Sequence, residues 1–313
     1  MYKFARIAGT GSYLPPKIVT NDDLAKTIDT SDEWIFSRTG IKSRRIVKGQ
    51  NTADLATIAA QNAIKSAGID VKDLDLIILA TTTPDKIFPA TATSVQHNIG
   101  ATCPAFDLQS VCSGFIFALT TAEAYIKTGM KNILVIGAET MSNIVNWDDR
   151  NTAVLFGDGA GAVVLSGSDD TGILHSQIFS DGSYISSLQT TNNKINEQGF
   201  ITMAGNEVFK IAVNKLSKLA VDTLKEAGLS GDDIDFMVPH QANIRIIKAV
   251  AKKINLPMER VILTLETHGN TSAASIPLAL DYGVKSGKIH KGHKLLLEGI
   301  GGGFSWGSVL LEF

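Results

Sequence analysis

The residue with the most reactive side chain in this sequence is Cys112, which lies between a short apolar run and an apolar segment of helical pattern. A cysteine thiolate is a good nucleophile, and the unpaired N–H groups and the dipole of a helix N-terminus favour the anion. We therefore expect Cys112 to have a lowered pKa and to act as a nucleophile, unlike Cys103. The competing interpretation is a buried structural thiol, because free cysteine is among the most buried residue types. A nucleophilic role requires a base and an oxyanion site elsewhere in the chain.

The elements that must position Cys112 can be predicted from the segments around it. Two aliphatic runs, Asp73–Ala80 and Asn132–Gly137, have the composition of strands that are buried on both faces. An amphipathic helix is predicted to begin after Asn51 and to end at Gly68. The order strand, helix, strand around Cys112 predicts an α/β layer architecture.

The sequence also contains a repeat of about half its length. Ala67-Gly68 and Asp73 have counterparts 160 positions later at Ala227-Gly228 and Asp233, and Ile133–Gly137 resembles a segment 162 positions later. A period of this length indicates a duplication rather than a solenoid, although common strand and helix patterns can match by coincidence. We therefore predict two related α/β halves, residues 1–170 with the cysteine and residues 171–313 with the partners described next.

Duplicated halves can direct their strand ends at one shared crevice, because ligands of open α/β sheets gather at the carboxyl ends of the strands. His240 follows a predicted strand, and Asn270 lies in the segment that aligns with Cys112. The three residues are therefore candidates for one site. His240 as a core histidine and Asn270 as a helix cap are the plain alternatives, and His268 is a rival for either role.

Three glycine-containing segments resemble known motifs. The segment Gly157–Ala162 matches the dinucleotide fingerprint, but a strand follows it where that fingerprint needs a helix. The segment Gly303–Gly307 matches a nucleophile elbow, yet too few residues follow for the histidine and acid of that fold. The run Gly299–Gly303 is better suited to a tight turn whose N–H groups bind an oxyanion, with simple turn geometry as the alternative.

Composition argues against several functional classes. The 313 residues include 29 basic and 31 acidic residues, a net charge of −2 that argues against nucleic-acid or membrane binding as the main function. We find no uninterrupted apolar stretch of the ~18 residues that a membrane span needs and no signal peptide. Two cysteines form neither a disulfide framework nor a zinc spacing, so we expect no metal and a cytoplasmic location.

Several segments together resemble β-ketoacyl-[acyl-carrier-protein] synthase III of the thiolase-like condensing enzymes: Trp34–Gly40, Cys112–Gly114, Met203–Lys210, Val238–Asn243, His268–Ala273 and Gly301–Gly307. The resemblance spans nearly the whole chain. It implies a thiolase-like five-layered αβαβα fold built from two duplicated halves. It also implies a homodimer that condenses a short acyl-CoA, with acetyl-CoA expected, with malonyl-acyl carrier protein at the start of fatty acid synthesis.

The resemblance also implies roles for individual residues. Cys112 would accept the acyl group, and His240 with Asn270 would face the malonyl thioester. Neutral hydrogen-bond donors can hold the enolate that decarboxylation leaves, so the chemistry needs no metal. The coenzyme A thioester and the malonyl carrier are substrates, and no cofactor is expected. The Cys112 N–H and the N–H of Gly302 would form the oxyanion hole, with Gly301 and Gly303 as alternatives.

For coenzyme A, the family pattern implies that Trp34 and Arg150 stack on the adenine, with Arg38 and Asn206 nearby. This chain departs from the pattern at Asn151, where relatives often carry glycine, and before the cysteine at 109–111. The acyl pocket is expected to include Phe88, Phe156, Met203 and Phe304.

A carrier-protein site can be argued partly from the sequence. Arg245, Lys248 and Lys252 fall at i, i+3 and i+7 of a predicted helix just after His240, and form a basic face near the expected site. Such a face is usually only solvated; the resemblance adds Lys210 to it. The alternatives to a primary synthase are a related enzyme of secondary metabolism and a catalytically silent binding subunit, which an intact Cys-His-Asn set opposes.

Overall fold

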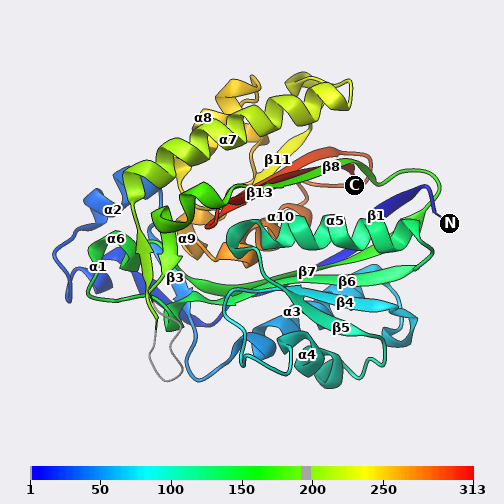
Figure 1. Cartoon of the computed structure of the whole chain (residues 1–313), viewed down its shortest axis with the longest axis horizontal. Helices are drawn as coiled ribbons and strands as arrows, with labels where there is room; N and C mark the ends of the chain where they lie inside the picture. Colours follow the sequence, from blue (N-terminus) through cyan, green and yellow to red (C-terminus); the bar gives the residue numbers. More distant parts are fainter. Residues whose placement is uncertain (1, 192–198) are drawn as a thin grey trace.

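The computed structural model describes residues 2–191 and 199–313, which fold into five alternating layers of helix and sheet (Figure 1). The first sheet has the order β1-β7-β6-β4-β5, and the second has the order β11-β12-β13-β8. The strands of the first sheet are β1 (Phe4–Tyr13), β4 (Leu76–Ala80), β5 (Ala105–Leu108), β6 (Asn132–Thr140) and β7 (Asp158–Ser168). Those of the second are β8 (Ile173–Ser180), β11 (Phe236–Pro239), β12 (Lys294–Gly301) and β13 (Ser305–Glu312).

Helices form the other three layers. One outer layer contains α3 (Thr52–Ala67) and α4 (Thr91–Ile99), and the other contains α7 (Gly205–Glu226) and α8 (Ile244–Lys253). The middle layer, between the two sheets, consists of α5 (Gly114–Lys127) and α10 (Ser275–Lys285). The predicted five-layered α/β fold is therefore confirmed.

The two sheets repeat the same pattern of strand directions. In the first, β4 runs parallel to β6, β6 antiparallel to β7, and β7 antiparallel to β1. The second sheet follows the same pattern: β11 runs parallel to β12, β12 antiparallel to β13, and β13 antiparallel to β8. Each half also has a short 3₁₀ turn before its middle helix, Val111–Ser113 before α5 and Ser272–Ala274 before α10. The repeat seen in the sequence is thus a repeat of structure.

Local sequence explains why these elements form. Every residue of β6 is buried, as expected for a strand that is covered by helices on both faces. Helix α3 begins at a capping box of Asn51 and Asp54 and ends at Gly68 in the left-handed conformation, as predicted. It packs closely on β1, because a Cβ on Gly11 would lie only 2.3 Å from the backbone nitrogen of Ala63.

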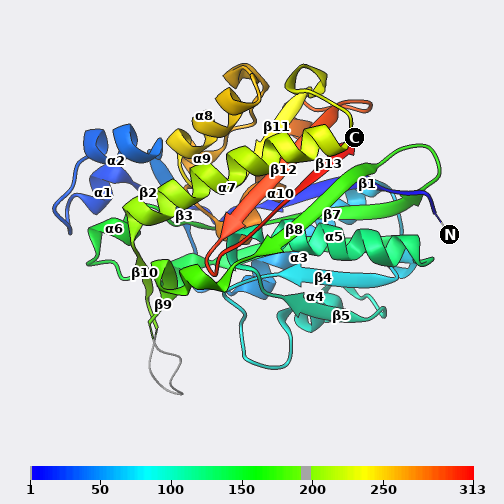
Figure 2. The same cartoon turned by 45° about the horizontal axis from the view of Figure 1, so that its top comes forward.

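Smaller elements surround the end of the molecule where the cysteine lies. They are the antiparallel pairs β2 (Lys17–Thr20) with β3 (Ser43–Ile46) and β9 (Leu188–Thr190) with β10 (Ile201–Met203), and the helices α1 (Asn21–Leu24), α2 (Asp32–Thr39), α6 (Arg150–Ala153) and α9 (Leu265–His268). Figure 2 shows β9 and β10 projecting beside the N-terminal end of α7. Within residues 2–191 and 199–313, no helix is both long enough and apolar enough to cross a membrane.

Candidate active site

Cys112 lies at the carboxyl end of β5, in the 3₁₀ turn that leads into α5, with only 4% of its surface exposed. The preceding residue, Val111, has a φ of 51°, a left-handed conformation that is rare for a β-branched residue. Burial raises the pKa of the Cys112 thiol to about 12, and the nearby Glu139 adds to this effect while a hydrogen bond with Ser272 opposes it. The expected lowering of the pKa is therefore wrong: desolvation of the thiolate outweighs the helix N-terminus, and the resting group is a thiol.

His240 follows β11 directly and is also buried. Its Nδ1 lies 2.6 Å from Ser275 Oγ, which itself accepts the Gln241 N–H at 3.4 Å. We assign the hydroxyl proton of Ser275 to the bond with Nδ1, an assignment that places the imidazole N–H on Nε2. Burial lowers the pKa of His240 to about 4, so the ring is neutral and acts as a donor near neutral pH.

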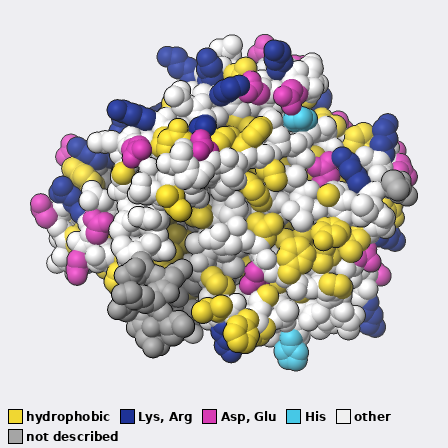
Figure 3. Space-filling model, viewed as in Figure 1, with side chains coloured by type: hydrophobic (Ala, Val, Ile, Leu, Met, Phe, Trp, Pro, Cys, Tyr) yellow, Lys and Arg dark blue, Asp and Glu magenta, His cyan; other side chains and the backbone are white. Residues whose placement is uncertain are grey.

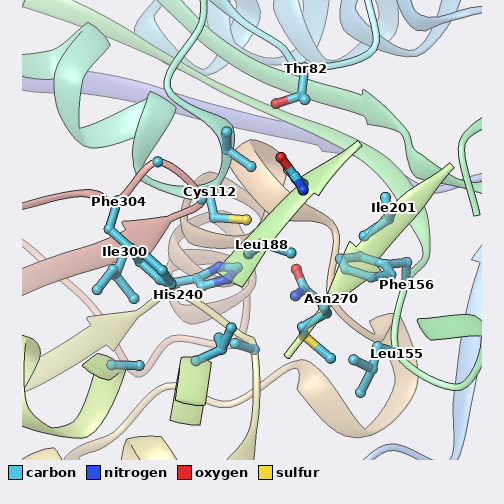
Figure 4. Close-up of a pocket in the computed structure, with 18 of the residues that line it drawn as sticks. Thr82, Cys112, Leu155, Phe156, Leu188, Ile201, His240, Asn270, Ile300 and Phe304 are labelled. Carbon is cyan, nitrogen blue, oxygen red and sulfur yellow. The ribbon is translucent and has the colours of Figure 1, made fainter. Parts of the chain in front are cut away.

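Asn270 is held in place through both its backbone and its side chain. Its N–H donates to Leu155 O at 2.9 Å, and its carbonyl accepts the Gly157 N–H at 3.0 Å. The side-chain Oδ1 accepts the Ser272 N–H at 2.9 Å, which leaves the NH2 group as the donor for a ligand. Figure 4 shows Cys112, His240 and Asn270 converging on one cavity from three different elements. The grouping of these residues predicted from the sequence is what the structure displays.

The cavity has a volume of about 370 Å³ and is lined mainly by apolar side chains. Three of the residues expected in the acyl pocket, Phe156, Met203 and Phe304, line it. Phe88 does not: it is 82% exposed, in the loop between β4 and α4. This loop projects away from the body of the molecule (Figure 2), and a place for Phe88 in the acyl pocket stays a prediction.

The glycines expected at the oxyanion hole lie beside the nucleophile. Gly302 and Gly303 line the cavity. Gly301 packs directly on the cysteine backbone, since a Cβ there would lie 2.7 Å from Cys112 N. Only glycine permits this approach. Which of these N–H groups binds an oxyanion stays a prediction, with Gly302 as the expected donor.

Several residues expected to bind coenzyme A form a cluster. The guanidinium carbons of Arg38 and Arg150 lie 4.6 Å and 4.8 Å from the centre of the Trp34 ring. Arg150 also donates to Asp29 O at 3.0 Å. Asn206 is exposed in the first turn of α7, next to Gly205, which lines the cavity. A flat aromatic ring beside two flat cations is suited to a planar ligand, so nucleotide stacking remains the expected role of this cluster.

The basic residues of α8 are exposed as predicted. Arg245, Lys248 and Lys252 lie on the outer face, while the helix buries its apolar face in the core. Arg245 lies 4.8 Å above the ring of Phe209 on α7, and Phe209 lines the cavity. Lys210 is exposed on α7 beside Phe209. Figure 3 shows Lys and Arg side chains, with some acidic ones among them, along the edge of the molecule that carries α7 and α8. Through Phe209 this basic surface lies next to the cavity lining.

Two polar residues beside the nucleophile are absent from the sequence-based predictions as named functional residues. Ser272 accepts a hydrogen bond from the Cys112 thiol at 3.3 Å. Glu139, at the end of β6, is fully buried and is hydrogen-bonded to Ser272. An acidic residue just after the apolar run Asn132–Gly137 is a signal that could have identified Glu139, since site residues gather at strand carboxyl ends.

Comparisons with known proteins agree with this geometry. Residues 106–182 match the model of 3-oxoacyl-[acyl-carrier-protein (ACP)] synthase III, and residues 224–313 match that of its C-terminal region. The chain is 70% identical to a protein named beta-ketoacyl-[acyl-carrier-protein] synthase III from Vesicomyosocius okutanii, over the whole length of both.

Solved structures agree equally well. A 3-oxoacyl-[acyl-carrier-protein] synthase III from Aquifex aeolicus is 48% identical with a TM-score of 0.95, covering 99% of this chain and 100% of that one. The priming beta-ketosynthase of the R1128 polyketide biosynthetic pathway is 35% identical with a TM-score of 0.96, covering 99% and 97%. The chain therefore belongs to the 3-oxoacyl-[acyl-carrier-protein] synthase III family.

Proposed function

We propose that this protein is a β-ketoacyl-[acyl-carrier-protein] synthase III, which transfers a short acyl group from coenzyme A to Cys112 and condenses it with malonyl-acyl carrier protein. The observation that carries the proposal is the convergence of a buried thiol, a neutral histidine donor and an amide donor on one apolar cavity. The neutral histidine and the amide are suited to hold an enolate, and the thiol becomes the nucleophile when its proton is removed.

In the first half-reaction, Cys112 Sγ loses its proton and attacks the carbonyl carbon of the acyl-CoA thioester, and coenzyme A leaves as the thiolate. Sulfur is suited to this exchange because it is both a soft nucleophile and a good leaving group. The carbonyl oxygen becomes negative in the tetrahedral intermediate and would be held by the backbone N–H groups of Cys112 and Gly302. The Trp34, Arg38 and Arg150 cluster would hold the nucleotide end of coenzyme A.

In the second half-reaction, malonyl-acyl carrier protein loses CO2 and leaves an enolate. Its oxygen would accept hydrogen bonds from His240 Nε2–H and the Asn270 NH2 group. Neutral donors are suited to this role because they stabilise the negative oxygen without giving up a proton and quenching the carbanion. The enolate carbon then attacks the acyl carbon on Cys112, the cysteine sulfur leaves, and 3-oxoacyl-acyl carrier protein is formed.

Two surfaces near the cavity have the character expected for binding sites of protein partners. An acidic carrier protein is suited to the basic surface of Lys210, Arg245 and Lys248. A second copy of the chain would cover the exposed apolar loop of Ile87 (94% exposed) and Phe88 (82% exposed). Figure 3 also shows hydrophobic side chains gathered over α5, so we propose a homodimer. A cytoplasmic location stays a prediction.

A second candidate is a priming synthase of secondary metabolism. The observation that favours it is the likeness to the R1128 priming ketosynthase, whose fold matches as closely as that of the Aquifex protein. The acyl chain and the carrier distinguish the two candidates. Loading with a panel of acyl-CoAs, followed by condensation with malonyl groups on different carrier proteins, would identify the preferred primer; we expect acetyl-CoA.

The two half-reactions can be separated by mutation. Cys112→Ser should block stable loading by acyl-CoA, seen by intact mass, while CO2 release from labelled malonyl carrier stays measurable. Asn270→Ala should slow condensation by about 10²–10³-fold with little effect on loading, because one enolate donor is lost.

Asn270→Asp is the matched control for that experiment. It keeps the oxygen that accepts the Ser272 N–H but loses the NH2 donor. Similar losses in CO2 release for Asn270→Asp and Asn270→Ala would therefore assign the effect to the donor. Loss of loading as severe as in Cys112→Ser would instead show that Asn270 holds the turn together, and the assigned division of roles would be wrong.

A further inference from the structure

A buried chain of hydrogen bonds leads away from the nucleophile. The Cys112 thiol donates to Ser272 Oγ at 3.3 Å, and the Ser272 hydroxyl hydrogen-bonds the carboxylate of Glu139. Ser272 and Glu139 are both fully buried. The bonds therefore run in one direction, from thiol to hydroxyl to carboxylate.

The surroundings of Glu139 identify it as an ionised acceptor at rest. Its carboxylate accepts the backbone N–H groups of Thr82 at 3.0 Å and Thr83 at 3.1 Å, and the Thr83 hydroxyl at 2.6 Å. The Ala273 N–H contributes a longer contact of 3.4 Å. An ionised carboxylate has only acceptors and satisfies all these donors, whereas a protonated one would present its own proton to them. Burial nonetheless raises the pKa of Glu139, which favours the protonated form.

The backbone at both ends of the first bond is held in an uncommon conformation. Val111, just before the nucleophile, has a φ of 51°, and Ser272 has a φ of 48°. Non-glycine residues in this region cost free energy and persist where the surrounding structure enforces them, which is often at functional sites. Here the two strained turns place the Cys112 thiol and the Ser272 hydroxyl together across 160 residues of sequence.

The chemistry of loading requires an acceptor at this position. Cys112 rests as a thiol, so its proton must leave as the sulfur bonds to the acyl carbon. His240 is not available, because Nδ1 faces the hydroxyl of Ser275 and Nε2 already carries a proton. Ser272 Oγ already accepts a hydrogen bond from the Cys112 thiol and is therefore placed to receive its proton.

We infer that Ser272 and Glu139 form a proton relay for Cys112, an inference that rests on the proposed function and deepens it. As the bond from Sγ to the acyl carbon forms, the Sγ–H bond breaks and the proton passes to Ser272 Oγ. The hydroxyl proton of Ser272 passes to Glu139. Ser272, which touches the reacting sulfur, is then a catalytic residue, and Glu139 is a positioning residue and proton store that acts through it.

The relay also determines where protons are consumed. Coenzyme A leaves as a thiolate and takes a proton from water, while Glu139 keeps the cysteine proton during the acyl-enzyme stage. When the cysteine sulfur is expelled in condensation, Glu139 returns this proton through Ser272. With Glu139 as the proton store, loading therefore takes up one solvent proton and condensation takes up none. If Glu139 did not store the proton, loading would take up none and condensation would take up one.

Proton uptake by the wild-type protein tests this directly. Stopped-flow mixing with acyl-CoA at pH 7, in weak buffer with an indicator dye, should show a proton taken up for each Cys112 loaded, with loading followed by intact mass. No uptake on loading, with uptake on later addition of malonyl-acyl carrier protein, would overturn the relay. A protein that does not load at all would overturn the proposed function instead.

Substitution of Glu139 gives a second test, because a relay and a purely electrostatic role predict opposite changes in the loading rate. The negative charge of Glu139 raises the pKa of Cys112, so a merely electrostatic role predicts that Glu139→Gln loads faster than wild type. The relay predicts slower loading, by about 10²-fold or more, as for loss of a general base. Ser272→Ala should slow loading to a similar degree, and CO2 release from malonyl carrier should be unchanged in both.

Loading at or above the wild-type rate in Glu139→Gln would overturn the inference, as would equal loss of loading and CO2 release in a variant whose melting temperature is unchanged. If Glu139→Gln does not fold, Glu139→Asp, which keeps the carboxylate, should retain both the proton uptake and part of the loading rate. A folded Glu139→Asp that loads without proton uptake would also overturn it.

Discussion

At the scale of single residues, burial sets the charge of the reacting groups. The same desolvation that raises the pKa of Cys112 to about 12 lowers that of His240 to about 4, so both are neutral at rest. A neutral His240 is a donor across the range in which a free imidazole would titrate. The site therefore needs an acceptor for the thiol proton but no charged histidine.

A second buried carboxyl, Glu298 on β12, gives a prediction about stability. Neither of its side-chain oxygens has a hydrogen-bond partner among the described residues, and burial raises its pKa to about 8. The folded protein therefore binds a proton here that the unfolded chain, with an ordinary carboxyl, releases at a lower pH. The contribution of this group is most favourable below pH 4.5 and is lost as the pH rises through about 8.

Glu298→Gln should remove this pH dependence because glutamine does not ionise. Relative to wild type, its free energy of unfolding should rise with pH, reaching a gain on the order of a few kcal/mol at pH 9. Urea denaturation from pH 5 to 9 would measure it, with exposed Glu259→Gln as the control. A constant difference between Glu298→Gln and wild type across this range would show that Glu298 does not titrate with folding.

The grouping of the three candidate site residues could be predicted from the sequence, but their environment could not. Cys112, His240 and Asn270 could be grouped because the duplication aligns strand ends. The Cys112 pKa was predicted in the wrong direction, because burial is a property of the packed molecule. The exposure of Phe88 could not be predicted, because its residue type does not show which way a loop projects.

At the scale of secondary-structure elements, α7 and α8 carry the basic surface beside the cavity. The apolar side of α8 is buried through residues such as Ile247 and Val250, so the exposed cations are free to meet a partner. The amphipathic pattern of α8 could be predicted from sequence spacing. The cover that β9 and β10 provide over the cavity could not, because these strands are short and follow no strong period.

Charge reversal on α8 should separate the two substrates. Arg245→Glu with Lys248→Glu should raise the KM for malonyl-acyl carrier protein by about tenfold or more at low salt, with acyl-CoA loading of Cys112 nearly unchanged, and the effect should fade as salt is added. The matched control is Lys288→Glu with Lys291→Glu, exposed residues near the N-terminal end of β12, away from the cavity. Equal loss of both half-reactions in the α8 variant would indicate a structural role for the helix.

At the scale of the whole molecule, the exposed apolar loop leads us to expect a dimer. The protein should elute with about twice the 33.4 kDa mass of one chain in size-exclusion chromatography with light scattering. Ile87→Asp with Phe88→Asp should shift this mass toward one chain, because buried charge in an apolar contact is costly. Ile18→Asp, at a residue that is 51% exposed on β2, is the control. A single-chain mass for the wild type would contradict the proposal.

The matching turns before α5 and α10 have a consequence for how the protein can vary. Glu139 and Cys112 come from one half of the chain and Ser272 from the other, so the hydrogen-bonded row crosses the seam between the two copies. A chimera of two relatives joined between β7 and β8 would keep each sheet whole. Any incompatibility between the parents would then be concentrated where the turns and the middle helices meet. We therefore expect a chimera to be active only when its two halves come from parents whose residues at this seam are compatible.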